Sequence, residues 1–367
     1  MIYLRGLSFL LAIPFTVSIL IVSCTPVTER AKNEKTFSFE TLPKSISLQG
    51  KKKYYPELKM PYTLFTNNDL LIVGESKRTY DEFPPIHLIH SQKMDYLGAK
   101  GVIGFGPGEL SDVAGMDAGS NENTFWVYSA MEKRFSEFSL EDTTSLSSNQ
   151  IKQEGDFFMA MAMKFSSDST VMCRMVNDPF RFVEFSLDGQ RIKNYGKWKD
   201  ILVRKDFTDY MMADLHLGYF QGNQRNQTYA YASAYRDRLE ILDKKSEQIY
   251  LVDGPYNFIP EFTVATSGGK SNGVIVDINE PMAYAAVEVS DDYIYGLYCG
   301  RTFRKVREGS EYATEIYVFD LLGTIICELK LDTSIRALAV NEQAGKLYGI
   351  TTDEDPGIAV FDLPSFD

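Results

Sequence analysis

A short apolar run with the character of a strand recurs along the chain, and each copy is followed by a tight polar turn. The copies begin at His87, Ser136, Phe182, Arg238, Ile316 and Ile358. Two more strand-like runs precede each copy, as in 283–289 and 293–298. A period of two bounded by Asn, Asp and Gly is typical of half-buried strands joined by turns. Each unit therefore predicts a four-stranded antiparallel sheet.

The units repeat at intervals of about 40 to 80 residues, the range expected of propeller blades with loop insertions. The sequence thus predicts an all-β fold, a six-bladed β-propeller of four-stranded antiparallel blades. The sixth unit ends after its third strand, so we expect the N-terminal segment Thr36 to Leu48 to close the ring. Apolar spacing over Asp200 to Leu215 predicts a short helical insertion.

The first residues are typical of an export signal. Arg5 precedes an apolar run from Leu7 to Val22, which Pro14 interrupts. A membrane-spanning helix needs about 20 consecutive apolar residues, so the run predicts a cleaved signal peptide, with an uncleaved anchor helix as the alternative. The run ends in the bacterial lipobox pattern Ile-Val-Ser-Cys, in which the final cysteine, Cys24, is acylated.

These features predict three parts of the chain: a lipoprotein signal peptide with lipobox over 1–24, a flexible tether over 25–35, and a single propeller domain over 36–367. A protein anchored by lipid at Cys24 belongs in the cell envelope, on the periplasmic or the surface side of a membrane. The membrane is therefore one predicted partner.

The net charge argues against one class of partner, and the cysteine content argues against disulfide bonds. The net charge is −12, and loss of Arg5 with the signal peptide makes it more negative. Binding to nucleic acid needs clustered Lys and Arg, so the sequence argues against a nucleic-acid partner. Cys173, Cys299 and Cys327 form an odd set without paired spacing, which argues against a disulfide framework.

The segment Gly101-Val-Ile-Gly-Phe-Gly-Pro-Gly-Glu-Leu110 lies between the first two units. It resembles the G-x-G-P-G-E-[FL] signature of the TolB-like six-bladed propeller lipoproteins of Bacteroidetes. Together with the lipobox and the repeats, the resemblance covers nearly the whole mature chain. It implies the fold and the location, but no reaction, no cofactor and no catalytic residue.

Three local motifs suggest chemistry that their context does not support. The glycines around Pro107 lack the following lysine and helix of a phosphate loop, and favour a turn between blades. The string from Gly269 to Gly273 matches G-x-S-x-G, but its loop-like flanks and the absence of a downstream histidine argue against a hydrolase. His87 and His90 point to opposite faces of a strand, so we expect no metal site there.

The remaining candidate is a surface formed by loops between strands two and three. Arginine and aromatic residues, which favour binding hot spots, are frequent in these loops. The predicted ligand or partner-binding residues are Arg78, Arg134, Arg236, Arg238, Arg301, Arg304, Arg307 and Glu109. The sequence does not specify whether the ligand is a protein, a glycan or a small molecule.

Two functions fit this fold. The preferred hypothesis is a tethered binding or interaction module without catalysis. The alternative is a metal-dependent lactonase- or hydrolase-like enzyme whose carboxylates converge in the central channel, with Glu109 and Asp112 as candidates. A purely structural role in the envelope is a third possibility.

Overall fold

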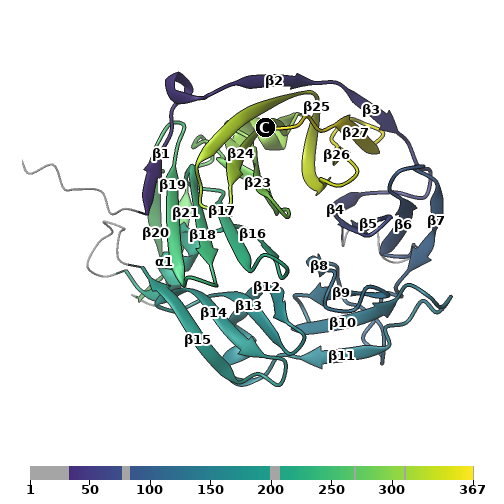
Figure 1. Ribbon diagram of the computed structural model, residues 1–367. Coiled ribbons are helices and arrows are strands. Elements are labelled where there is room, and N and C mark those ends of the chain that lie inside the picture. The colour runs from purple at the N-terminus through teal and green to yellow at the C-terminus, as the bar shows by residue number, and fades with distance from the viewer. Residues whose placement is uncertain (1–32, 77–82, 199–206, 268–269, 310, 367) are drawn as a thin grey trace, which may run out of the picture. The chain divides into compact units, whose positions relative to one another are not determined.

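Apolar side chains on both faces of the middle strands pack against the neighbouring blades, and the sheets surround a central channel (Figure 1). The computed structural model describes residues 33–76, 83–198, 207–267, 270–309 and 311–366. Asn33–Asp367 forms one unit. The predicted lipidation site Cys24 lies outside the described residues.

The first three blades are consecutive four-stranded antiparallel sheets. Blade I comprises β4 (Pro61–Asn67), β5 (Leu70–Glu75), β6 (Ile86–His90) and β7 (Tyr96–Lys100). Blade II comprises β8 (Gly115–Asp117), β9 (Thr124–Ser129), β10 (Arg134–Ser139) and β11 (Asn149–Lys152). Blade III comprises β12 (Ala160–Ser167), β13 (Thr170–Met175), β14 (Phe180–Ser186) and β15 (Arg191–Lys197).

The last three blades include strands that come from the N-terminal segment. Blade IV comprises β16 (Gly218–Asn223), β17 (Thr228–Ser233), β18 (Arg238–Asp243) and β19 (Gln248–Asp253). Blade V comprises β22 (Tyr284–Val289), β23 (Tyr293–Tyr298), β24 (Ala313–Asp320) and the first part of β25 (Ile325–Asn341). Blade VI uses the last part of β25 with β26 (Lys346–Thr351), β27 (Ile358–Asp362) and β3 (Gly50–Lys53).

The third strands β6, β10, β14, β18, β24 and β27 contain or overlap the six repeated runs, so the predicted six-bladed fold is confirmed. The core consists of separate layers between consecutive blades. Leu64 of blade I packs with Tyr348 of blade VI, for example, and Phe65 packs with Phe125 of blade II. Burial between blades explains why second strands such as β9 and β17 are buried along their whole length.

The N-terminal segment closes the ring as predicted, but through other residues. The fourth strand of blade VI is β3, whereas the predicted segment Thr36 to Leu48 lies on blades IV and V. There β1 (Glu34–Thr36) pairs in parallel with β19, and β2 (Ser45–Leu48) pairs in parallel with β25. Figure 1 shows β1, β2 and β3 (purple) along the outer edge of the unit.

The polar composition of β3 explains this error. An outermost strand can expose its side chains, so Lys51, Lys52 and Lys53 give no apolar pattern. Phe37 and Leu48, which made the earlier segment resemble a blade strand, are buried against blades IV and V. Gly50 also fits this position, because a Cβ there would lie 2.6 Å from the ring of Phe361.

An insertion lies between blades III and V. The helix α1 (Asp209–Leu215) begins after Thr208, whose side chain accepts a hydrogen bond from the Met211 N–H. It confirms the predicted helix over 209–215; residues 200–206 of that prediction lie outside the described part. The hairpin of β20 (Phe262–Ser267) and β21 (Lys270–Val276) follows blade IV. The loop predicted around Ser271 and Gly273 is therefore wrong, because these residues belong to β21.

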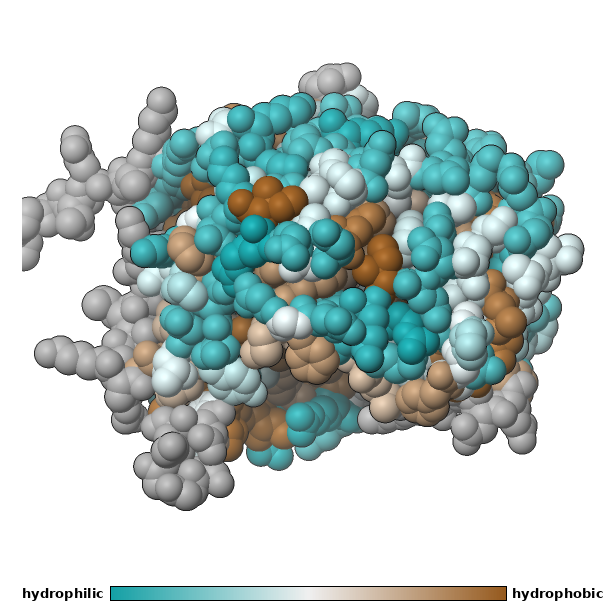
Figure 2. Space-filling model, turned by 90° about the horizontal axis from the view of Figure 1, so that it is seen from below, coloured by the Kyte–Doolittle hydropathy of each residue, from teal (hydrophilic) through white to brown (hydrophobic). Residues whose placement is uncertain are grey.

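The surface of the unit is asymmetric. Figure 2 shows hydrophilic side chains gathered toward one edge and hydrophobic patches nearer the opposite edge. The most exposed large apolar side chains, Phe105, Ile259 and Tyr256, belong to connections between successive blades. Within the described residues, no helix is long and apolar enough to cross a membrane.

Candidate functional site in the central channel

The first strand of each blade lines the central channel, which contains two cavities. The first cavity has a volume of about 890 Å³ and lies at the last residues of these strands and the turns that follow them. The second, of about 320 Å³, lies between the first halves of the same strands. Phe65, Lys164 and Gln221 line both cavities, so the two spaces adjoin inside the channel.

The larger cavity, here called the acidic mouth, is lined by ionisable and amide side chains. Six carboxylates line it: Asp69, Asp117, Glu122, Glu288, Asp291 and Glu342. Only two lining residues, Lys164 and Arg225, are cationic. Asn and Gln contribute most of the other polar side chains. The excess of carboxylates produces a negative potential that the low-dielectric walls of a channel strengthen.

Glu288 occupies a central position on β22. Its Oε2 accepts a hydrogen bond of 3.0 Å from Gln221 Nε2. Burial raises the pKa of Glu288 to about 8; nearby Lys164 opposes this shift, while the charges of Asp117 and Glu342 add to it. At neutral pH this carboxyl group is therefore largely protonated, and it would ionise readily beside a bound cation.

Lys164 is the buried cation of the channel. Its Nζ donates a hydrogen bond of 2.7 Å to the Met116 carbonyl oxygen, and only 9% of the residue is exposed. This bond ties the ammonium group of Lys164, on blade III, to the backbone of blade II, near Glu288. Lys164 therefore compensates part of the negative charge without an ion pair to any described carboxylate of the lining.

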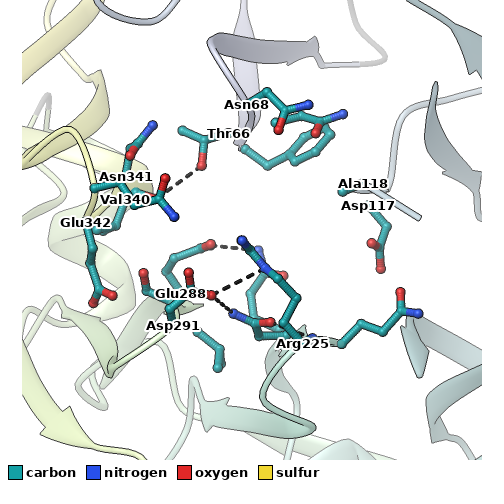
Figure 3. A pocket seen from close by; sticks show the side chains of 18 of the residues that line it. Thr66, Asn68, Asp117, Ala118, Arg225, Glu288, Asp291, Val340, Asn341 and Glu342 are labelled. Carbon is teal, nitrogen blue, oxygen red and sulfur yellow. Dashed lines mark hydrogen bonds and ion pairs between the residues drawn. The ribbon is translucent and has the colours of Figure 1, made fainter. Parts of the chain in front are cut away.

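Two further carboxylates lie at the rim, close to Glu288. Asp291 Oδ1 accepts a hydrogen bond of 2.9 Å from Asn223 Nδ2 and lies 3.4 Å from Arg225 Nε. Glu342 accepts a hydrogen bond of 2.9 Å from the Tyr295 hydroxyl, and burial raises its pKa. Figure 3 shows Glu288, Asp291 and Glu342 on one side of the cavity, with Asp117 across from them.

Some polar residues of the mouth also stabilise the fold. Asn341 Oδ1 accepts the Ala344 N–H, and Asn223 Oδ1 accepts the Arg225 N–H, as in ordinary turns. Asp117 accepts the N–H groups of Gly119 and Phe165, and so joins blades II and III. These structural roles account least well for the position of Glu288.

The predicted residues Glu109 and Arg134 are joined through Gln150. Arg134 Nη1 donates to Gln150 Oε1, and Gln150 Nε2 donates to the Glu109 carbonyl oxygen. The Glu109 carboxylate folds back and accepts the Gly106 N–H at 2.8 Å. A Cβ at Gly104 would lie 1.9 Å from this carboxylate, which explains the glycine in the signature motif. Asp112 similarly accepts the N–H groups of Ala130 and Met131.

Arg236 and Arg238 are buried rather than displayed at the surface. Arg238 forms a bidentate pair with Asp253, with distances of 2.6 and 2.7 Å. Burial and the neighbouring Arg238 lower the pKa of Arg236. Arg238 thus joins β18 to β19 within blade IV, and the burial of both arginines makes them unsuited to bind a ligand from solution.

The last predicted arginines lie around the helix α2 (Phe303–Glu308) of blade V. Arg301 pairs with Glu311, Arg304 Nε donates to Asn279 Oδ1 at 2.9 Å, and Arg307 is exposed. Phe303 contacts Tyr235 at 5.3 Å between ring centres, which places this group beside Arg236. Arg78 lies outside the described residues. None of the predicted residues that the structure describes lines either cavity.

The residues of the acidic mouth were missed because each resembles ordinary turn chemistry. A usable signal was present, however: the first hairpin turn of one blade after another contains Asn, Asp, Gln or Glu, as in 67–69, 223–227 and 341–343. In a propeller these turns meet around one end of the channel. Over the described part of the chain, no group of three or more His, Cys, Asp or Glu residues is arranged to hold a metal ion.

Comparisons with known proteins agree with this architecture. Residues 36–343 match the family model described as "TolB-like 6-blade propeller-like". The chain is similar in structure to a member of the DUF4221 family from Bacteroides vulgatus, with a TM-score of 0.55, 13% identity, and coverage of 86% of this chain and 98% of that chain.

A second similar structure is that of a protein from Bacteroides fragilis described as exported. The TM-score is 0.54 at 11% identity, with 90% of this chain and 98% of that chain covered. At these identities the likeness shows the fold alone. No curated protein matched the sequence.

Proposed function

This chain belongs to the family of TolB-like six-bladed propellers, and from that premise we propose that it is a lipid-anchored binding protein of the cell envelope. Its ligand is a small, positively charged molecule with several hydrogen-bonding groups, held in the acidic mouth. The observation that carries this proposal is the ring of six carboxylates against two cations around a cavity of about 890 Å³. That volume lies in the range typical of small-molecule sites.

The electrostatics of Glu288 favour a cation over an anion. Burial is the main cause of the raised pKa of Glu288, and the negative charges of Asp117 and Glu342 add to it, so these carboxylates repel a further negative charge there. A cation bound in the mouth has the opposite effect. It stabilises the ionised form of Glu288 and is attracted by Asp291 and Glu342. The amide side chains offer both donors and acceptors, which suits a ligand carrying amino and hydroxyl groups.

The matched probes glucosamine and N-acetylglucosamine test this class, because they differ chiefly in the charge of one amino group. Spermidine and Ca²⁺ extend the series to a polyamine and a metal ion. Isothermal titration and thermal melting of the mature chain are expected to show binding of cationic probes only. Saturation at a hundredfold excess over Kd would stabilise the fold by about 2.7 kcal/mol.

The variant Glu288→Gln preserves size and the hydrogen bond to Gln221, and is expected to weaken cation binding about tenfold. The control Glu354→Gln makes the same substitution at an exposed position outside the mouth, and is expected to leave binding unchanged. Equal affinity for glucosamine and its neutral partner, or equal loss in both variants, would refute the cation site.

The lipid anchor is a separate part of the proposal and needs its own test. The lipobox at Cys24 supports it. Mass spectrometry of the mature protein is expected to find acyl chains on an N-terminal Cys24, and Cys24→Ser is expected to release the protein from the membrane fraction. An intact N-terminus beginning at Met1 would instead support an uncleaved anchor.

A further inference from the structure

The smaller cavity of the channel has apolar walls and a localised positive group. Its apolar lining includes Leu64, Met116, Met163, Val287 and Leu338. Arg336, Lys164 and four tyrosines, Tyr62, Tyr128, Tyr219 and Tyr312, also line it. A cavity of about 320 Å³ with few, clustered polar groups is at the small end of ligand sites.

Arg336 differs from most described arginines in its partners. Eight others, such as Arg134, Arg225 and Arg238, are paired with a carboxylate. Arg336 makes no hydrogen bond or ion pair with a described residue. Its guanidinium instead lies 5.3 Å from the ring centre of Tyr62 and 5.8 Å from that of Tyr312.

This stacking fixes the guanidinium while leaving its N–H groups available. Contacts with aromatic faces use the plane of the group, whereas hydrogen bonds to an anion use its edge. An arginine held in this way loses less conformational entropy when it binds a carboxylate than a mobile surface arginine does.

The two inner tyrosines add hydrogen-bond donors at the same place. The hydroxyl oxygens of Tyr219 and Tyr312 lie 3.5 Å apart. Burial raises the pKa of both, so both hydroxyls remain protonated at neutral pH. Tyr62 is 48% exposed and marks the opening of the cavity to solvent.

We propose that this smaller cavity binds a small organic anion, a carboxylate with an apolar body. The carboxylate meets the edge of Arg336 and the tyrosine hydroxyls, and the apolar body fills the space between the inner strands. The orientation follows from charge, because the acidic mouth with Glu288 lies beyond the inner end of this cavity and repels an anion placed deeper. This site is independent of the cation site proposed above.

Phenylacetate and 2-phenylethanol have similar shapes, but only phenylacetate is charged, so together they test whether the site needs a carboxylate. Sulfate tests whether an anionic group binds without an apolar body. Titrations use the full mature chain in a non-ionic detergent, with detergent alone as the reference. We expect phenylacetate to bind at least about tenfold more tightly than 2-phenylethanol or sulfate.

The variant Arg336→Gln is expected to reduce phenylacetate affinity about tenfold or more, whereas Lys245→Gln, which removes an exposed charge on blade IV, is expected to have no effect. Arg336→Lys retains the charge but not the planar edge of the guanidinium. It is also expected to weaken phenylacetate binding, but less than Arg336→Gln does. Circular dichroism confirms that each variant is folded. Tyr219→Phe provides a second test that leaves Arg336 in place, with an expected loss of a few fold.

The proposal is overturned if phenylacetate fails to bind at about 10 mM, or if it binds no more tightly than 2-phenylethanol. It is also overturned if folded Arg336→Gln or Arg336→Lys binds phenylacetate as the unmodified protein does. Equal binding of sulfate and phenylacetate would indicate an adventitious ion only, and would overturn it as well. Glucosamine titrations of the same variants measure the cation site separately, so that failure of this proposal can be distinguished from failure of the cation site.

Discussion

The two ends of the channel are built from the same six strands and yet have opposite chemistry. At the ends of the inner strands, the last strand residues and the turns that follow contribute six carboxylates and many amides around a wide opening. At their beginnings, the strands contribute apolar side chains and one stacked arginine around a narrow space. Each inner strand therefore carries a polar residue near its end and a small or apolar residue near its start.

This difference shows how a repeated fold can present distinct surfaces without a change in architecture. The blades are fixed by the buried layers between them, and apolar residues of the narrow end, such as Leu64 and Leu338, belong to these layers as well as to the cavity wall. The polar residues of the wide end, such as Glu288, lie outside the layers and can vary more independently. Lys164 and Gln221 border both spaces, so the chemistry changes over the length of a few residues.

Both cavities depend on closure of the ring, so opening the ring should weaken binding at both ends of the channel. We expect Gly50→Val to produce the largest effect, since its Cβ would lie 2.6 Å from the buried ring of Phe361. Overpacking of this kind costs about 1–3 kcal/mol. Urea unfolding measures the cost. Binding of glucosamine and phenylacetate should fall together, and a variant that loses only one would show that closure acts on one end alone.

Lys164→Met should lower the stability of the fold and raise the cation affinity of the acidic mouth. Removal of this ammonium group leaves Glu288 without a nearby positive charge and removes the hydrogen bond that the Met116 carbonyl oxygen accepts from Lys164. We expect a loss of about 1–2 kcal/mol in the free energy of unfolding. Cation affinity should nevertheless rise, because a positive charge has been removed. Lys245→Met is the exposed control, and a fall in cation affinity for Lys164→Met alone would contradict the electrostatic account.

Much of the architecture was predictable because it depends on local periodicity. The runs at Phe182, Ile316 and Ile358 are mainly apolar and each is followed by a polar turn, and each belongs to a third strand. A strand packed between two neighbouring blades is buried on both faces and therefore forms a nearly continuous apolar run. The closing strand β3 was not predictable in the same way, since Lys51 to Lys53 lie at an exposed edge where burial imposes no pattern.

The candidate site was hidden for a different reason. Glu288 stands in the alternating sequence Val287-Glu288-Val289, where a charged residue suggests the solvent side of a strand. Its true neighbours, Gln221 and Lys164, come from other blades. Conversely, Arg236 and Arg238 resemble loop arginines in the sequence but are buried in the structure. Only the assembled ring decides which charged residues meet a cavity.

The pH dependence of stability gives the smallest and most selective test of the acidic mouth. The pKa of Glu288 is about 8 in the folded protein, above its ordinary value of 4.5. Between these values the folded state binds more protons than the unfolded state, so this residue lowers stability as the pH rises. The loss is complete only above about pH 8.

Glu288→Gln should remove this slope, so its stability relative to the unmodified protein should increase from about pH 5 to pH 9. Because a side chain facing a water-filled channel is partly solvated, we expect a gain of only a few degrees in Tm at pH 9. Thermal melting across this range, with Glu354→Gln as the exposed control, measures the difference. A gain of the same size at pH 5 and pH 9 would mean that the variant improves packing, and that the carboxyl group of Glu288 does not titrate as the mouth's electrostatics require.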